Sequence, residues 1–429
     1  MTFWAALRLA VAAAGVLAGG SDLAFAGADA GAAAGNAPGA VASAAQTPLP
    51  YVLDARVVGD EHHVRFVVDT STPLAAAVFG LADPYRIVID LPEVRFVLPD
   101  NAGTEGRALV SAFRYGVISA GKSRIVIDLT GPVAIDKQFV VPPADGQPAR
   151  LVIDLVPTTR DKFLAMAQSY RNSHATPDTS AVNAAAPSGD TGKPLIVLDP
   201  GHGGIDSGTR GSGGVLEKDI VLAFAKVLGD KLAATNRYRV AYTRTDDTYV
   251  SLGDRVKMAR EQHAALFLSV HVNSFPTGAV RGTIVYTVSD AASDKMAAAL
   301  ADSENQSDAL AGIDVKAEDS DQVKDILLDL TQRETRNFGL AFAQALVRHL
   351  GKTTMMFKVP HQQASFKVLE APDVPSALIE LGYISNPEDR KELTSPAWQA
   401  EVADTMVGAI DGYFQKETAA TFVTGAANP

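Results

Sequence analysis

Two histidines and two glutamates are the residues of this sequence best suited to chemistry: His202, His271, Glu217 and Glu380. The chain contains no cysteine, which excludes a thiolate nucleophile, a disulfide framework and a cysteine-bound metal. Any metal must therefore be bound by histidine and carboxylate groups. Two histidines and one carboxylate, with a fourth position open to water, are the ligand set of a catalytic zinc hydrolase.

Each of these residues stands at the end of a predicted strand or at the start of a predicted helix. His202, His271 and Glu380 each follow a strand-like segment, and Glu217 opens an amphipathic segment after a glycine-rich loop. The strands are predicted at 195–198, 266–270 and 376–379, and the helix at 217–232. In an open α/β sheet the carboxyl ends of the strands share one edge, where ligands bind. We therefore expect the four side chains to converge.

A metal held by this set would activate water, because zinc lowers the pKa of a water ligand to roughly 7. Glu380 is then the candidate general base, since a carboxylate beside the metal can accept the proton of that water. Each residue alone has a simpler explanation. An isolated histidine is often structural, Glu217 could complement a helix N-terminus, and Glu380 could pair with Arg390. Their shared position at one sheet edge favours the metal site.

The segment 194–416 alternates between strand-like and helix-like patterns. Further strands are predicted at 238–243 and 283–288, and further helices at 252–262, 335–350 and 397–414. Such alternation is typical of α/β domains. We predict an open, mostly parallel sheet with helices on both faces.

Residues 49–157 consist of short β-branched segments separated by proline or glycine. Four of these segments share an arginine and a following aspartate, namely 63–69, 86–91, 124–129 and 150–155. The internal similarity predicts a small all-β, sandwich-like domain. We interpret the arginines and aspartates as cross-strand ion pairs on an exposed face, with a binding surface as the alternative.

Length and composition limit the classes of protein. With 429 residues, the chain is long enough for two domains and connecting segments. A content of 47% hydrophobic and 20% charged residues is that of a globular protein. The formal net charge of -11 argues against nucleic-acid binding, because no basic excess exists to neutralise phosphates. It also argues against binding to anionic membranes by charge alone.

Residues 1–26 are typical of a secretory signal peptide. The apolar segment 9–19 precedes Ala24-Phe-Ala26, a small-x-small cleavage pattern. We expect cleavage after Ala26 and export to the periplasm, with an uncleaved anchor as the alternative. The apolar segment is too short to span a bilayer. We also predict a flexible tether at 27–48, a linker at 158–193 with one helical turn near 163–170, and a C-terminal tail at 417–429.

Four features together resemble the zinc-dependent N-acetylmuramoyl-L-alanine amidases in order, spacing and local context. They are DPGHGG (199–204), the glutamate that opens the next helix, SVHVN (269–273) and PSALIELGYISN (375–386). The resemblance covers roughly residues 194–416. It implies an enzyme that hydrolyses the amide bond between the lactyl group of N-acetylmuramic acid and L-alanine in peptidoglycan.

The same resemblance implies roles for individual residues. His202, Glu217 and His271 would bind Zn²⁺, and Glu380 would be the catalytic carboxylate. Asn273 and Arg255 stand in family-like contexts, and we expect them to support the site. The β-domain at 49–157 resembles the AMIN domain, which in that family targets the enzyme to peptidoglycan at the division site. The whole chain therefore resembles a periplasmic cell-division amidase that acts in daughter-cell separation.

Residues 289–334, approximately, form an insert that a minimal catalytic domain would not need. Its first part, 291–306, is predicted to be a helix that places Met296, Leu300 and Glu304 on one face. Glu304 could lie at the solvated edge of that helix. In division-associated amidases such a helix is autoinhibitory, which implies that Glu304 fills the fourth zinc position.

The second part of the insert is amphipathic, with Val323, Ile326, Leu327 and Leu330 on one face. This stretch could pack on the core or bind a partner. In the family, a LytM-type activator protein binds such an element, so we expect an activator near 323–330. We expect a monomer without further cofactors.

Two other functions compete with the amidase. A zinc carboxypeptidase acting within the peptide stem would use the same ligands, and only its products would differ. A non-catalytic cell-wall-binding protein would keep the fold but should lose a ligand or the base. All four key residues are present here, which disfavours that second alternative.

Overall fold

The structure is a computed structural model that describes residues 48–99, 101–173, 192–313 and 326–425. The predicted signal peptide, nearly all of the tether, half of the linker and Val323 lie outside these residues. None of the helices in the described ranges combines the length and the apolar character that crossing a bilayer requires.

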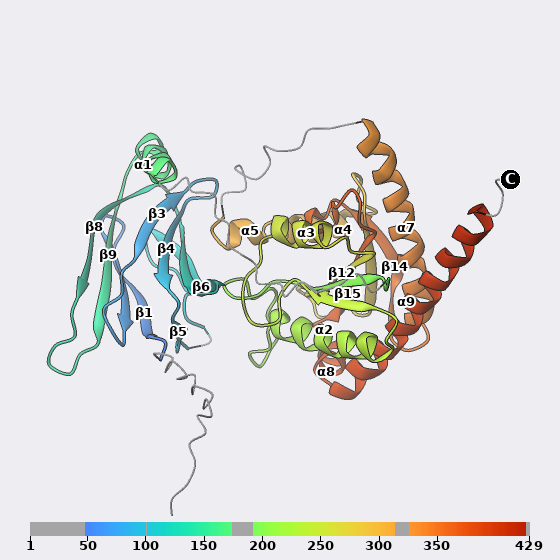
Figure 1. The fold of residues 1–429 in the computed structure, drawn as a ribbon. Coiled ribbons are helices and arrows are strands. Elements are labelled where there is room, and N and C mark those ends of the chain that lie inside the picture. The colour runs from blue at the N-terminus through green and yellow to red at the C-terminus, as the bar shows by residue number, and fades with distance from the viewer. Residues whose placement is uncertain (1–47, 100, 174–191, 314–325, 426–429) are drawn as a thin grey trace, which may run out of the picture. The chain divides into compact units, whose positions relative to one another are not determined.

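The first domain contains two antiparallel sheets (Figure 1). One sheet has the order β5-β1-β2-β9-β8, with β1 (Tyr51–Gly59), β2 (Val64–Thr70), β5 (Arg95–Phe96), β8 (Val133–Val141) and β9 (Ala149–Pro157). Only the short contact of β5 with β1 is parallel. The other sheet has the order β3-β4-β7-β6, with β3 (Ala77–Leu81), β4 (Arg86–Pro92), β6 (Val110–Ser119) and β7 (Lys122–Leu129).

The alternation of side chains along these strands builds the core between the sheets. Phe66 and Ile153 from one sheet and Ile89 and Ile127 from the other are fully buried in a single cluster. Because successive side chains of a strand point to opposite faces, the intervening residues point outward. The predicted all-β, sandwich-like domain is confirmed.

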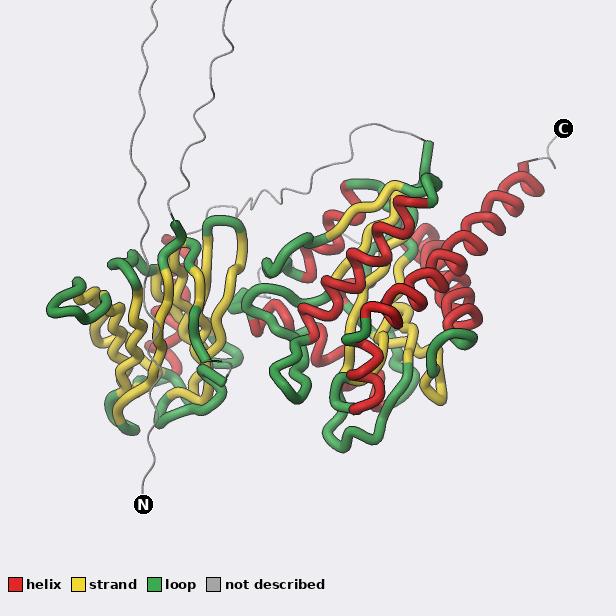
Figure 2. The backbone as a smooth tube through the Cα atoms, turned by 90° about the horizontal axis from the view of Figure 1, so that it is seen from below, coloured by secondary structure: helices red, strands yellow, loops and turns green. Residues whose placement is uncertain are grey.

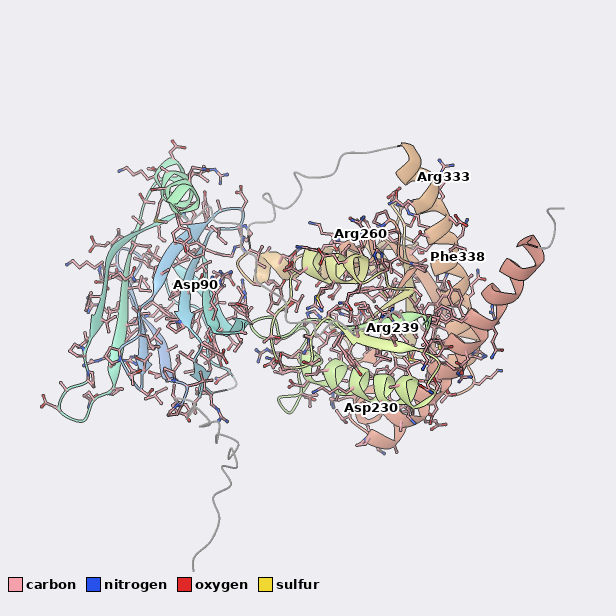
Figure 3. All side chains as sticks on the ribbon, viewed as in Figure 1. Asp90, Asp230, Arg239, Arg260, Arg333 and Phe338 are labelled. Atoms are coloured by element: carbon pink, nitrogen blue, oxygen red, sulfur yellow. The ribbon has the colours of Figure 1, made fainter. Side chains whose placement is uncertain are left out.

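The four similar segments become the central strands β2, β4, β7 and β9. The register places Arg65 opposite Asp154 and Arg124 opposite Asp90, and each pair makes two hydrogen bonds. The expected cross-strand ion pairs are thus present. The second pair departs from the expectation of an exposed face, because Asp90 (labelled in Figure 3) and Arg124 are both buried.

Helix α1 (Arg160–Ser173) is longer than the single turn that we expected near 163–170. Phe163 is buried in the core of the sandwich, and the ring of Tyr170 stacks on that of Phe79 at 3.9 Å between centroids. The first part of the predicted linker therefore packs on the β-domain. The predicted turn already included Phe163 and Tyr170, but the alanine-, serine- and threonine-rich composition of 158–193 indicated a linker instead of a packed helix.

The second domain is built around a six-stranded sheet. Its order is β11-β10-β12-β15-β13-β14, formed by β10 (Leu195–Pro200), β11 (Arg239–Tyr242), β12 (Leu266–Asn273), β13 (Thr283–Val288), β14 (Met356–Ala364) and β15 (Ser376–Tyr383). All neighbours are parallel except β13 and β15. The edge strand β14 was not predicted, because its polar residues interrupt the strand pattern.

Helices cover both faces of this sheet (Figures 1 and 2). One apolar cluster joins the sheet to α2 (Glu217–Ala234), α7 (Ile326–Leu350) and α9 (Pro396–Gly425), and the other joins it to α3 (Leu252–Glu261) and α4 (Lys295–Glu304). The remaining helices are α5 (Ser307–Leu310), η2 (Lys367–Leu369) and α8 (Pro387–Leu393). The predicted α/β domain with a mostly parallel sheet is confirmed.

Some boundaries differ from the prediction. Helix α7 begins at Ile326 instead of Thr335, so part of the amphipathic stretch continues into it. Helix α4 begins at Lys295, after Asp294 accepts a capping hydrogen bond from the backbone nitrogen of Ala297. Helix α9 continues to Gly425, through most of the predicted tail.

Candidate metal centre

The loop after β10 holds His202 in a fixed position. The backbone of His202 has a φ of +58°, a left-handed conformation that is uncommon for a residue with a side chain. Arg255, which is 2% exposed, donates hydrogen bonds to the carbonyl oxygens of Pro200 at 2.9 Å and His202 at 2.7 Å. It also pairs with Asp199 at 2.6 Å. Arg255 therefore supports the loop geometry.

Glu217 is oriented by two backbone amides. Its Oε1 accepts a hydrogen bond from the nitrogen of Val272 at 2.9 Å, and its Oε2 accepts one from the nitrogen of Thr209 at 2.9 Å. Val272 belongs to β12 and follows His271 directly. The bond from Val272 thus joins the first turn of α2 to the strand that carries the second histidine.

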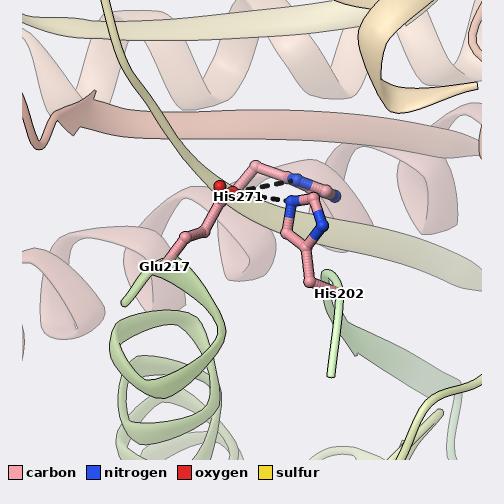
Figure 4. A group of neighbouring side chains, drawn as sticks. All are labelled: His202, Glu217 and His271. Carbon is pink, nitrogen blue, oxygen red and sulfur yellow. Dashed lines mark ion pairs between the residues drawn. The ribbon is translucent and has the colours of Figure 1, made fainter. Parts of the chain in front are cut away.

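His202, Glu217 and His271 converge on one point (Figure 4). Glu217 Oε1 lies 3.1 Å from His202 Nε2 and 3.2 Å from His271 Nδ1. Ligand atoms about 2.0–2.1 Å from a tetrahedral zinc are about 3.3–3.4 Å apart. The three side chains therefore have the spacing that a zinc ion requires.

Two buried ring nitrogens also support a metal site. His202 Nε2 and His271 Nδ1 make no hydrogen bond within the described part of the chain. Burial would lower the pKa of His202, but the carboxylates of Asp206, Glu217 and Glu304 outweigh burial and raise it well above its ordinary value. Burial would likewise raise the pKa of Glu217, but His202 and His271 lower it to about 2. Groups that stabilise a positive charge here also favour a bound cation.

Two glycines allow the ligands to approach each other. A Cβ atom on Gly201 would lie 2.3 Å from His271 Cε1. A Cβ atom on Gly208 would lie 2.6 Å from both Glu217 Oε2 and His202 Cδ2. Both distances are shorter than carbon and oxygen atoms tolerate, so any side chain at these positions would displace a candidate ligand.

Glu380 lies beside this group. It stands opposite His271 in the pairing of β12 with β15, and it is 1% exposed. Its Oε2 makes no hydrogen bond within the described residues. Burial and the neighbouring carboxylates of Glu217 and Glu304 raise its pKa well above the ordinary value. A carboxylate with a free oxygen next to a metal centre is suited to proton transfer.

Glu304 enters the same group from the end of α4. Its Oε2 lies 3.4 Å from His202 Nε2 and 3.3 Å from His271 Nδ1, and its side chain is 14% exposed. With Glu217 Oε1, these atoms are four potential ligands, and the four distances between carboxylate oxygens and imidazole nitrogens lie between 3.1 and 3.4 Å. The alternative of a solvated helix edge does not fit this position.

Asn273 makes hydrogen bonds to the backbone next to the metal centre. Its Oδ1 accepts a hydrogen bond from the nitrogen of Ser274 at 2.6 Å, and its carbonyl oxygen accepts one from the nitrogen of Ile384 at 2.8 Å. These bonds shape the turn after β12. Within the described residues, no contact joins its side chain to the metal-ligating atoms.

The sequence reasoning missed Asp206 and Arg244. Asp206 Oδ2 lies 2.9 Å from His202 Nδ1 and leaves Nε2 for a metal. Arg244 donates to the carbonyl oxygens of Pro200 at 2.9 Å and Gly201 at 2.8 Å. The sequence contained one signal for Asp206, its position four residues after the candidate ligand His202. It contained no signal for Arg244, because Arg244 follows β11, which carries none of the candidate ligands.

Comparisons with known proteins show which family the chain resembles. A family model described as N-acetylmuramoyl-L-alanine amidase matches residues 196–412, and the AMIN domain matches residues 54–155. The amidase AmiC of Escherichia coli O6:H1 is 31% identical over 380 residues, covering 85% of this chain and 89% of that protein. AmiC of Neisseria meningitidis serogroup B is 30% identical over 396 residues, covering 88% and 93%. The solved amidase AmiC2 of Nostoc punctiforme is 28% identical, with a TM-score of 0.39, covering 53% of this chain and 99% of that one.

Proposed function

Because the chain belongs to the N-acetylmuramoyl-L-alanine amidase family, we propose that it cleaves peptidoglycan between N-acetylmuramic acid and L-alanine with the help of a zinc ion. His202, Glu217 and His271 would bind the ion. The observation that carries this proposal is the convergence of His202 Nε2 and His271 Nδ1 on Glu217 Oε1, at 3.1 and 3.2 Å, with neither nitrogen hydrogen-bonded within the described residues.

Zinc bound there would supply Lewis acidity, which polarises the carbonyl group and acidifies water. The residues of the chain then carry the proton. Glu380 accepts a proton from water while the water oxygen bonds to the lactyl carbonyl carbon. Glu380 then returns that proton to the alanine nitrogen as the C–N bond breaks. The products are a lactyl carboxylate and a stem peptide with a free amine.

The role of Glu380 can be tested by replacing it with glutamine. Glu380→Gln should retain zinc but lose about 10²–10⁴-fold in turnover on purified sacculi, the usual contribution of a general base. Glu401→Gln, at an exposed position of α9, is the matched control. Undiminished turnover of Glu380→Gln at full zinc content would remove Glu380 from the mechanism.

Product mapping distinguishes the amidase from a zinc carboxypeptidase. Mass spectrometry of digested sacculi should find intact glycan strands and whole stem peptides that begin with a free L-alanine amine. Stems shortened only at their carboxyl end would support the carboxypeptidase instead. This distinction depends on the bond cleaved and not on the ligand set.

We further propose that Glu304 inhibits the resting enzyme by taking the fourth ligand position. The positions of Glu304 Oε2 near both imidazole nitrogens support this role. Glu304→Ala should therefore raise the hydrolysis of sacculi in the absence of any activator. Unchanged basal hydrolysis at normal zinc content would contradict autoinhibition.

The remaining proposals concern the cellular setting. We propose export to the periplasm with cleavage after Ala26, targeting by residues 49–157, and action in daughter-cell separation, supported by the family and by the sequence pattern of residues 1–26. A LytM-type activator would bind near 323–330, where side chains lie outside the described residues. Mass spectrometry of the mature N-terminus would test cleavage after Ala26. Localisation of the chain with and without residues 49–157 would test targeting. Light scattering would test the expected monomer.

A further inference from the structure

We propose that Asn305, Ser307 and Asp308 form a latch that retains Glu304 over the metal centre, and that Asp206 joins this latch to His202. The proposal rests on the autoinhibition by Glu304 proposed above. The latch residues follow Glu304 directly in the chain, at the end of α4 and the start of α5. Each makes hydrogen bonds to a different segment of the domain.

Ser307 contacts the same oxygen that orients the first histidine. Its Oγ donates a hydrogen bond to Asp206 Oδ2 at 2.6 Å, and Asp206 Oδ2 lies 2.9 Å from His202 Nδ1. Both Ser307 and Asp206 are 5% exposed, so water does not compete for these bonds in the closed state, in which Glu304 lies over the metal centre. Opening of the latch would break the bond to Ser307 and leave the bond to His202 intact. The segment can therefore leave without releasing a metal ligand.

Asp308 attaches the segment to the start of α3. Its Oδ1 accepts hydrogen bonds from the hydroxyl group of Tyr249 at 2.6 Å and from the nitrogen of Leu252 at 2.9 Å. Leu252 is the first residue of α3, and a carboxylate is favourable at a helix N-terminus. Asp308 is 2% exposed.

Asn305 attaches the segment on its other side. Its Nδ2 donates to the carbonyl oxygen of Ser365 at 2.7 Å, and its Oδ1 accepts from the nitrogen of Lys367 at 2.9 Å. These two bonds join the end of α4 to the loop that precedes η2. Three neighbouring side chains thus bind three segments that are distant in sequence.

The apolar contacts of α4 are small compared with this polar attachment. Its fully buried side chains are Ala297 and Ala301, while Met296 and Leu300 are only partly buried. A helix that buries little apolar area gains little free energy from packing. The hydrogen bonds of the latch are therefore a principal attachment of the residues around Glu304.

The test compares latch variants with matched controls on the same segment, in the full zinc-loaded chain. Ser307→Ala and Asp308→Asn remove latch hydrogen bonds, whereas Ser303→Ala and Asp302→Asn make the same changes at exposed positions of α4. Each latch variant should raise basal hydrolysis of sacculi about 2- to 10-fold, the effect of losing one or two hydrogen bonds in the closed state. The controls should hydrolyse at the wild-type rate.

Two further measurements isolate the latch. In a Glu304→Ala background, the latch variants should add nothing, because the latch acts only through Glu304. Hydrogen exchange of the amides at 295–312 should become faster in the latch variants and not in the controls. Zinc affinity should stay unchanged in Ser307→Ala but fall about 10- to 100-fold in Asp206→Ala, which removes the support of His202. If Asp308→Asn is unstable, Tyr249→Phe removes the same bond from the other partner.

The outcomes separate this proposal from autoinhibition itself. If Glu304→Ala is activated while the latch variants match their controls in rate and in exchange, autoinhibition stands and the latch is overturned. If Glu304→Ala is not activated, autoinhibition fails, and the latch as a brake on activity fails with it. Faster exchange with a raised basal rate in the latch variants alone supports the latch.

Discussion

The two domains use the same kinds of charged residue in opposite ways. In the sandwich, carboxylates pair directly with arginines: Asp154 with Arg65 at 2.7 Å, and Asp90 with Arg124 at 2.6 Å. At the sheet edge of the α/β domain, one oxygen of Glu217 and one of Glu304 lie near the same two imidazoles, and within the described residues neither imidazole nitrogen that faces them makes a hydrogen bond. In the first arrangement arginine already balances the carboxylate charge, whereas the second offers its lone pairs to a cation.

This difference shows that residue type and proximity do not by themselves make a metal centre. His63, Asp136 and Asp154 also bring potential ligand atoms within 4.8 Å of each other. However, both oxygens of Asp154 already accept hydrogen bonds from Arg65, and His63 and Asp136 are exposed. Unoccupied lone pairs on buried groups are the distinguishing property.

The largest expected effect tests this comparison directly. His202→Ala should lose zinc and at least about 10³-fold in activity, because several kcal/mol of Lewis-acid stabilisation disappear. His63→Ala in the sandwich should leave zinc content and activity unchanged. Elemental analysis and hydrolysis of sacculi measure both. Equal zinc loss in the two variants would break the distinction between the domains.

The next effect concerns a buried ion pair near the site. Arg255→Met should destabilise the α/β domain by about 3–5 kcal/mol, because it leaves the carboxylate of Asp199 buried without its partner. Arg260→Met is the control on the same helix α3 (Figure 3), since the pair of Arg260 with Asp373 is 45% and 43% exposed. Its loss should cost at most about 1 kcal/mol. Calorimetry measures both, and similar costs would show that burial of the Arg255 pair is not decisive.

The sequence predicted four strands of the sandwich, five strands of the α/β sheet and the convergence of the four key residues, because the hydrophobic pattern and strand-end motifs are local signals. It could not predict β14, whose exposed Lys358 and buried Gln362 obscure the strand pattern. Nor could it predict that Asp206 accepts from Ser307, since that bond joins residues 101 positions apart. Such contacts depend on how the elements pack, and no local pattern records them.

A smaller effect should follow from replacing a glycine in each domain. Gly208→Ala places a methyl group against Glu217 and His202, and it should weaken zinc binding about 10- to 100-fold, as loss of ligand orientation does. Gly146→Ala in the sandwich has a similar backbone, with φ of +76° against +61°, but its Cβ would meet nothing within 4 Å. It should cost only about 1–2 kcal/mol of backbone strain and leave zinc binding unchanged. Chelator competition would measure the affinity, and equal affinities in the two variants would contradict the need for close approach at Gly208.

The smallest effect is expected from the exposed member of a sandwich pair. Asp154 is only 2% exposed, but Arg65, which is 44% exposed, lies between it and solvent, so water can reach the carboxylate in Arg65→Met and the change should cost only about 1 kcal/mol near neutral pH. The Arg65 guanidinium donates to Asp154 and lowers the pKa of Asp154 below its ordinary 3.8. The pair therefore stabilises the folded state above that ordinary value, and the stabilisation is lost as pH falls through the lower folded pKa. Calorimetric unfolding of the wild type and the variant should differ near neutral pH and converge in strong acid. The ring centroid of Phe139 lies 5.8 Å from Arg65 Cζ. If the difference in unfolding free energy persists in acid, Arg65 contributes through its packing over this ring and not through its charge.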